Sequence, residues 1–124
     1  MDGYAEYLAK RGYVCYTFDF CGGGTQSQSS GTTTDMTLLT ELDDLDAVVS
    51  FLAELDEVDA SRLVIAGESQ GGLVTALYTA RNSELVRGAI LLYPGLMIAD
   101  NARSQYADAS EIPETVGFMQ MTVS

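Results

Sequence analysis

Leucine and valine recur along the middle of the chain at the spacing of an amphipathic helix. They follow one another at steps of four, three, four and three residues, at Leu38, Leu42, Leu45, Val49 and Leu52. This spacing places them on one helix face, and the acidic residues between them mainly face water. The pattern predicts a helix over residues 36–55, with Asp35 or Thr34 as its N-cap.

Shorter helices and continuous apolar runs stand on either side of this helix. Helices are predicted over Tyr4–Arg11, ended by Gly12, and over Leu73–Arg81. Three apolar runs predict buried strands, and they cover Tyr13–Phe20, Leu63–Ala66 and Gly88–Tyr93. Because helices and strands alternate, we expect an α/β fold with about three parallel strands joined by crossover helices.

The periodic pattern ends after the third strand. Pro94 and Gly95 stop that strand, and residues 100–124 hold scattered apolar residues without a sustained period. We therefore divide the chain into a core over residues 1–96 and a C-terminal segment over residues 97–124.

The net charge of the chain argues against some classes of binding partner. Eighteen acidic residues against six basic residues give a net charge of -12. This charge repels phosphate backbones and anionic lipids, so we expect neither nucleic acid nor a membrane as partner. Half of the acidic residues lie between Asp35 and Asp59, which is typical of a solvated helix face and favours no metal site. Without a long apolar run or a signal peptide, a cytoplasmic location is expected.

The two cysteines do not form a zinc pattern, because no histidine accompanies them. Cys15 lies inside an apolar run and is predicted to be a small core residue. Cys21 precedes three glycines at positions 22–24. A reactive thiol and a phosphate-binding glycine loop are the two chemical interpretations there. The first lacks an activating histidine, and the second lacks a helix that starts within the glycines, so a plain loop is favoured.

The clearest chemical motif is Gly67-Glu68-Ser69-Gln70-Gly71, which matches G-x-S-x-G. It follows a predicted strand and opens a predicted helix, as a nucleophile elbow does. In an elbow the serine lies in a strained turn, and glycines two residues before and after it let strand and helix approach. Ser69 is then the nucleophile, and the backbone N–H of Gln70 stabilises an oxyanion. The alternative is an ordinary turn in which Ser69 caps the helix.

These segments resemble the α/β-hydrolase superfamily, and more narrowly bacterial esterases of the feruloyl/cinnamoyl esterase and serine-aminopeptidase-like group. The resemblance covers Tyr4 to Ala99 and is carried by residues 4–13, 18–24 and 67–72. The chain departs from such relatives at Cys21-Gly22-Gly23, where they usually have Asn-Gly-His or Arg-Gly-His.

The resemblance implies a partial α/β-hydrolase fold, with residues 97–124 as the beginning of a lid. It implies an acyl-enzyme reaction on a small ester or acyl substrate without a cofactor. The chain contains no histidine, so the triad acid, its histidine and a second oxyanion donor are expected outside these residues. The chain is then an incomplete copy that is inactive alone.

The resemblance also implies that a strand is missing between Val14–Phe18 and Leu63–Ala66. We expect that the free strand edges cause self-association. Two further hypotheses come from other classes of protein: a nucleotide- or flavin-binding α/β module, and a pseudoenzyme that serves as an interaction protein.

Overall fold

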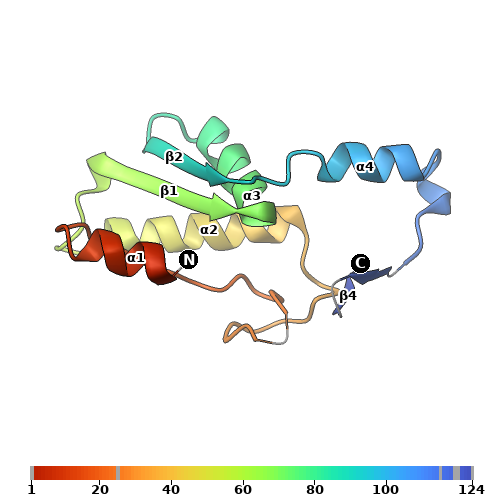
Figure 1. The fold of residues 1–124 in the computed structure, drawn as a ribbon, viewed down its shortest axis with the longest axis horizontal. Coiled ribbons are helices and arrows are strands. Elements are labelled where there is room, and N and C mark those ends of the chain that lie inside the picture. The colour runs from red at the N-terminus through yellow and green to blue at the C-terminus, as the bar shows by residue number, and fades with distance from the viewer. Residues whose placement is uncertain (1, 25, 115, 119–120, 124) are drawn as a thin grey trace.

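The computed structural model describes residues 2–24, 26–114, 116–118 and 121–123. The helices are α1 (Asp2–Ala9), α2 (Leu38–Ala53), α3 (Ser69–Arg81) and α4 (Ile98–Gln105), and short 3-10 turns cover Ala60–Arg62 and Ala109–Glu111. The strands are β1 (Leu63–Glu68), β2 (Val86–Leu92), β3 (Val116–Phe118) and β4 (Met121–Val123). β1 and β2 pair in parallel, whereas β3 and β4 form a separate antiparallel pair (Figure 1).

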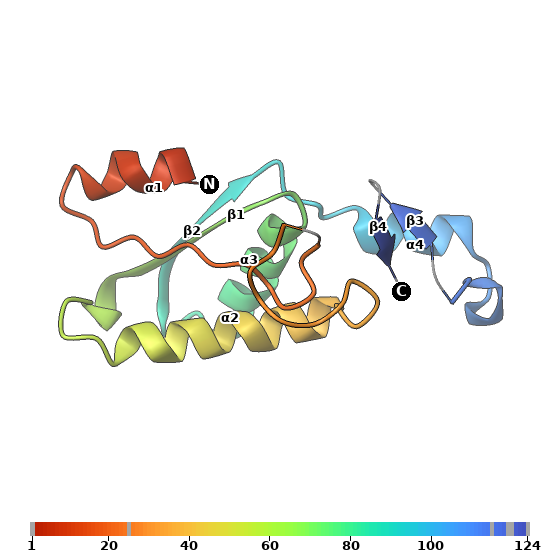
Figure 2. The same ribbon diagram turned by 90° about the horizontal axis from the view of Figure 1, so that it is seen from below.

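The parallel pair and two helices form the centre of the molecule. Ile65 lies opposite Ala89 and Glu68 opposite Leu92, so both strands end at the same edge. α3 packs on both strands and α2 packs on α3, while α1 lies on the other side of the sheet (Figure 2). This arrangement confirms the predicted α/β class with crossover helices.

The core lies between α2, α3 and the inner face of β1 and β2. Its buried apolar residues are Leu42, Leu45, Val49, Ile65, Leu73, Val74, Tyr78 and Val86. The α2 members of this set are those that the four-three spacing predicts, because that spacing keeps them on one helix face. The predicted stripe of the long helix is therefore confirmed.

The predicted strand Tyr13–Phe20 is wrong. These residues have no regular secondary structure, and Val14 and Tyr16 are 60% and 51% exposed. None of the described backbone hydrogen bonds joins residues 14–18 to β1, which pairs only with β2 among the described residues. A buried strand needs neighbours that satisfy its backbone N–H and C=O groups, and this stretch has none. The sheet therefore has two strands, not three, and the lack of pairing to β1 is as predicted.

Cys15 shares the exposure of this stretch. The sequence predicts a buried core residue, but Cys15 is exposed, because the segment that carries it does not join the sheet. The stretch contacts α2 through Tyr16, whose ring centroid lies 6.0 Å from that of Phe51, and contacts the core at its end. Phe18 and Phe20 are partly buried and pack against the core.

The N-cap of the long helix is Thr37, so the prediction of Asp35 or Thr34 is wrong. Thr37 and Thr40 form a capping box, in which each hydroxyl accepts a hydrogen bond from the other's backbone N–H, at 3.2 and 2.8 Å. Asp35 instead accepts a hydrogen bond from the Thr32 hydroxyl at 2.7 Å. The capping box satisfies backbone donors at the helix start more completely than one carboxylate would.

The segment after Pro94 contains a helix that the hydrophobic pattern does not predict. α4 has no buried residue, so its sequence needs no apolar stripe facing a core. Both views show it extending beyond the end of the sheet (Figures 1 and 2). The division at residues 96 and 97 remains a prediction. Among the described residues, no helix combines the length and the apolar character that a bilayer crossing requires.

Candidate active site

Ser69 lies at the junction of β1 and α3. Its φ is 52°, a left-handed value that only one other described non-glycine residue, Tyr93, shares. Such a backbone costs about 1–3 kcal/mol and persists only where the surrounding structure imposes it. Ser69 is exposed, and Glu68 rather than Ser69 is the N-cap of α3. The elbow geometry is therefore confirmed, and the alternative of Ser69 as a helix cap is wrong.

The glycines around Ser69 do not all have the predicted role. A Cβ at Gly67 would collide with the Gly71 carbonyl oxygen and the Thr75 hydroxyl, as the elbow requires. A Cβ at Gly71 would meet no neighbouring atom, so the prediction that this position needs glycine for close approach is wrong. The tight contact lies one residue later, where a Cβ at Gly72 would lie 2.8 Å from Pro94 Cβ.

The turn after β2 closes over the elbow. The N–H of Gly95 donates to the carbonyl oxygen of Ser69 at 2.7 Å. Tyr93 Oη donates to Glu68 Oε2 at 2.8 Å, and this hydrogen bond to a carboxylate raises the pKa of Tyr93. The parallel register brings these residues together, because Glu68 and Leu92 are paired at the carboxyl ends of the two strands.

The predicted oxyanion donor lies in the first turn of α3. The N–H of Gln70 is one of the first four N–H groups of this helix, which have no acceptor within the helix. The side chain of Gln70 is held elsewhere, since its Nε2 donates to Glu41 Oε2 on α2 at 2.8 Å. Glu41 is 3% exposed. Burial raises the pKa of Glu41, the Gln70 hydrogen bond lowers it, and the Asp44 charge raises it again.

Sequence reasoning missed Glu41, although its spacing carried a signal. It follows Leu38 by three residues and precedes Leu45 by four, so it lies on the apolar stripe of α2. A carboxylate on a buried stripe calls for a hydrogen-bonding partner. The sequence alone does not identify Gln70, which follows Glu41 by 29 residues, as that partner.

No base accompanies the serine among the described residues. The Ser69 hydroxyl takes part in none of the described side-chain hydrogen bonds, and the chain contains no histidine. Glu68 is engaged by Tyr93, and Glu41 is buried against Gln70. Among the described residues, the predicted nucleophile Ser69 and the predicted oxyanion donor Gln70 therefore have no neighbouring group placed to accept the serine proton.

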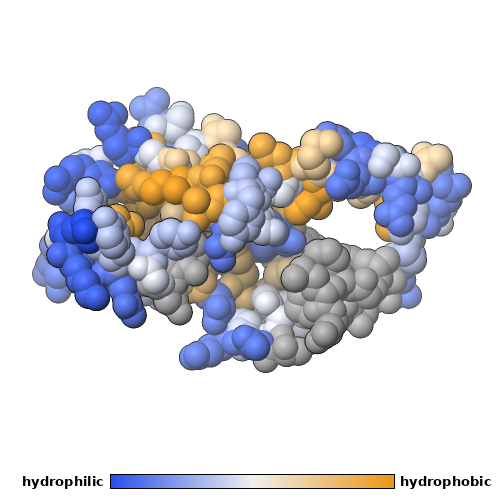
Figure 3. All heavy atoms as spheres, viewed as in Figure 1, coloured by the Kyte–Doolittle hydropathy of each residue, from blue (hydrophilic) through white to orange (hydrophobic). Residues whose placement is uncertain are grey.

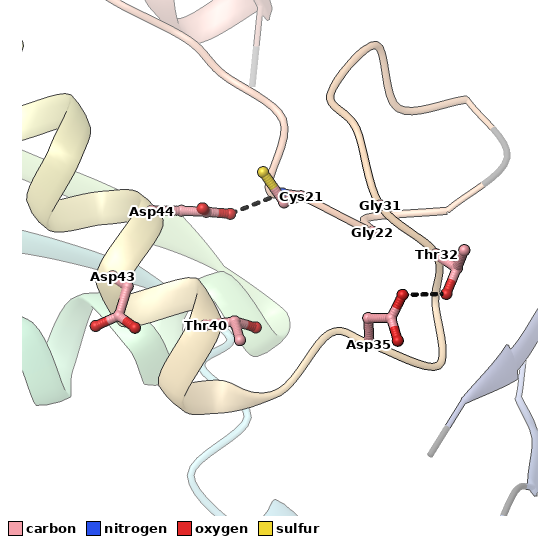
Figure 4. Close-up of a pocket in the computed structure, with 8 residues that line it drawn as sticks. All are labelled: Cys21, Gly22, Gly31, Thr32, Asp35, Thr40, Asp43 and Asp44. Carbon is pink, nitrogen blue, oxygen red and sulfur yellow. Dashed lines mark hydrogen bonds between the residues drawn. The ribbon is translucent and has the colours of Figure 1, made fainter.

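The glycine loop does not suit a phosphate group. Three of its backbone donors are occupied: the N–H of Cys21 donates to Asp44 Oδ2 at 2.7 Å, that of Gly22 to the Ser30 carbonyl oxygen at 2.8 Å, and that of Gly23 to the Phe20 carbonyl oxygen at 2.9 Å. The loop borders a hollow of about 310 Å³ that is also lined by Asp35, Asp43 and Asp44 (Figure 4). Three carboxylates repel an anion. Among the described residues, no group of three or more His, Cys, Asp or Glu side chains is placed so that it could hold a metal ion.

Comparison with protein families supports what the elbow indicates. The model of the family described as serine aminopeptidase, S33, matches residues 1–120, and this family is one of the α/β-hydrolases. The comparison with curated proteins gave no match. The match covers almost the whole chain, including β1, the elbow and α3. The chain belongs to the serine aminopeptidase S33 family of α/β-hydrolases.

Proposed function

We propose that this chain carries part of the active site of a serine ester hydrolase that works through an acyl-enzyme, with Ser69 as the nucleophile. The observation that carries the proposal is the backbone of Ser69, whose φ of 52° presents an exposed serine at the strand-to-helix junction. The membership of the chain in a family of hydrolases also supports this role. Residues held in such strained backbone conformations cluster at active sites.

The proposed reaction uses two groups of the elbow, the Ser69 hydroxyl and the Gln70 backbone N–H. Ser69 Oγ attacks the acyl carbon of a small ester, its proton passes to a base, and the oxyanion faces the Gln70 N–H. Collapse of the tetrahedral intermediate breaks the ester C–O bond and releases the alcohol. Water then hydrolyses the acyl-enzyme.

The base is the part that these 124 residues do not provide. We infer that the chain holds part of the machinery and does not turn over esters alone. Wild type and Ser69→Ala should hydrolyse p-nitrophenyl acetate at equal rates in a buffer without imidazole. A higher rate for wild type would show that the chain contains a base of its own.

Covalent capture tests the nucleophile directly. The purified chain is incubated with a fluorophosphonate in imidazole buffer, which replaces the missing base, and the adduct is located by peptide mass spectrometry. Ser69 Oγ forms a bond to phosphorus, fluoride leaves, and imidazole takes the proton. We expect one adduct, on Ser69, that is absent from Ser69→Ala and present in a Ser83→Ala control. No adduct, or an adduct equally distributed over other residues, would overturn the proposal.

A pseudoenzyme that kept the fold is the second candidate, favoured by the lack of histidine. It predicts that Ser69 is no more reactive than Ser83 even with imidazole. The nucleotide-binding hypothesis receives no support from the occupied donors and the carboxylates of the glycine loop.

A further inference from the structure

The interface between α2 and α3 buries a carboxyl group that has no cationic partner among the described residues. Glu41 is 3% exposed, and the ion pairs of the described residues are both elsewhere, between Arg62 and Asp59 and between Arg103 and Asp100. A buried carboxyl with one amide partner is less favourable than an apolar side chain of similar size. A residue kept only for packing would therefore be apolar, which points to a role for the hydrogen bond to Gln70.

That hydrogen bond holds the residue next to the nucleophile. Glu68, the N-cap of α3, makes no side-chain hydrogen bond to the helix start, so the first turn lacks a side-chain cap. Besides the hydrogen bond from Tyr93 to Glu68, two others hold the elbow. The N–H of Gly95 holds the Ser69 carbonyl oxygen, and Glu41 holds the Gln70 side chain at 2.8 Å. The second contact restrains the residue whose backbone N–H faces the oxyanion.

We propose that Glu41 is a positioning residue, which fixes the oxyanion donor of Gln70 by anchoring the Gln70 side chain to α2. This inference rests on the proposed role of Ser69 and Gln70. Glu41 touches no reacting atom. Its oxygen acts as the hydrogen-bond acceptor that holds Gln70, and its negative charge is not needed, because a negative charge close to the oxyanion would destabilise the oxyanion. The same acceptor is available in a neutral glutamine.

A second hydrogen bond between the same helices provides a matched control. Tyr78 Oη on α3 donates to Asp46 Oδ1 on α2 at 2.9 Å, and Tyr78 is 3% exposed. It lies nine residues beyond Ser69 along the chain, about two and a half turns of helix away. If Glu41 only held α2 against α3, then Tyr78→Phe and Glu41→Leu would slow the chemistry at Ser69 alike.

The experiment measures the rate of Ser69 phosphonylation in imidazole buffer, where the phosphoryl oxygen occupies the oxyanion position. Misplacing one donor should slow this rate about tenfold in Glu41→Leu and in Gln70→Met. Glu41→Gln should stay within about threefold of wild type, since it keeps the acceptor, and Tyr78→Phe within about twofold. In the double variant, Glu41→Leu should add nothing to Gln70→Met, because one residue acts through the other.

Each contrary outcome has a separate meaning. Additive effects in the double variant, or equal slowing in Tyr78→Phe, would overturn the positioning role while leaving Ser69 as the nucleophile. If wild type fails to label on Ser69, the proposed function falls. The positioning role is then decided by the ¹H–¹⁵N resonance of the Gln70 backbone amide. This resonance should shift in Glu41→Leu and stay in place in Tyr78→Phe. An unmoved resonance would overturn it. If Glu41→Leu does not fold, the labelling rate of Gln70→Met is compared with that of wild type and Tyr78→Phe in its place.

Discussion

Two stretches of this chain, β1 and residues 13–18, are both mainly apolar and lie in very different environments. In β1 the backbone pairs with β2 and Ile65 is 8% exposed. In the earlier stretch the backbone pairs with neither strand among the described residues, and Tyr13 and Val14 are 64% and 60% exposed. Hydrophobicity alone therefore does not place a segment in a sheet. A neighbour must also take its backbone hydrogen bonds.

The two stretches also differ in the contacts that hold them in place. β1 leads into an elbow held from β2, α2 and the turn at Pro94. The earlier stretch makes a ring contact between Tyr16 and Phe51 of α2. The residues that follow it are held by hydrogen bonds, since Asp19 accepts from the Gln28 N–H at 3.1 Å and the Cys21 N–H donates to Asp44. Hydrophobic side chains remain gathered over the outer face of β1 (Figure 3). Val64 is 52% and Ile90 45% exposed on the two paired strands.

The largest expected effect is self-association through this surface. The free edge of β1 and the exposed side chains of residues 13–16 offer both hydrogen bonds and apolar area. Sedimentation velocity should show dimers or larger species that increase with salt, because salt screens the net charge of -12. Replacing Tyr13, Val14 and Tyr16 by serine should restore monomers. A wild-type monomer at all concentrations, with one sharp thermal transition, would contradict the prediction.

The next largest effect should come from the elbow glycine. Gly67→Ala places a methyl group against the Gly71 carbonyl oxygen, which is backbone and cannot move away. We expect a loss of about 3 kcal/mol in the free energy of unfolding by urea. Gly71→Ala is the control, since its Cβ would meet no neighbour, and alanine is the better helix former by about 1 kcal/mol. Equal midpoints for the two variants would mean that the strand and helix are not in close contact.

A pair of valine substitutions compares the two regions directly. Val74 is 0% and Val14 60% exposed, so the same chemical change removes core packing in one case and surface in the other. Val74→Ala should lower the free energy of unfolding by about 2 kcal/mol and Val14→Ala by less than about 0.5 kcal/mol. A large loss for Val14→Ala would show that residues 13–18 are buried in solution.

The hydrophobic pattern predicts the fold well where local spacing and tertiary packing agree. The stripe of α2 and the runs of β1 and β2 are examples, with ends that shift by a few residues. It fails at residues 13–20, since whether a strand forms depends on a partner elsewhere. It fails again at α4, which buries nothing and so needs no pattern.

Some features of the candidate site are likewise predicted by the sequence, and others are not. The position and strained backbone of Ser69 follow from the motif and its flanking elements, because a tight strand-to-helix turn leaves few conformations. The contacts of Gly72 with Pro94 and of Gln70 with Glu41 join segments 22 and 29 residues apart. Such contacts depend on how the turn and α2 pack, which no local pattern encodes.

The smallest effect concerns proton binding at Glu41. Burial raises the pKa of this carboxyl above its ordinary value of 4.5, so the folded chain keeps a proton that the unfolded chain releases. The stability that this group contributes is therefore fully present below pH 4.5 and is lost as the pH rises through the folded-state pKa. Many other carboxylates titrate nearby, so only a difference between matched variants isolates this contribution.

Glu41→Gln removes the titration and keeps the hydrogen-bond acceptor. Its melting temperature minus that of wild type should therefore rise between about pH 4 and pH 7, as wild type loses the protonated form. Tyr78→Phe serves as the control, because burial and the Asp46 hydrogen bond raise the pKa of Tyr78 to about 12, far outside this range. Its difference from wild type should stay constant. If Glu41→Gln also shows a constant difference, the carboxyl titrates as it would in water, and the anchor that holds Gln70 is not buried in solution.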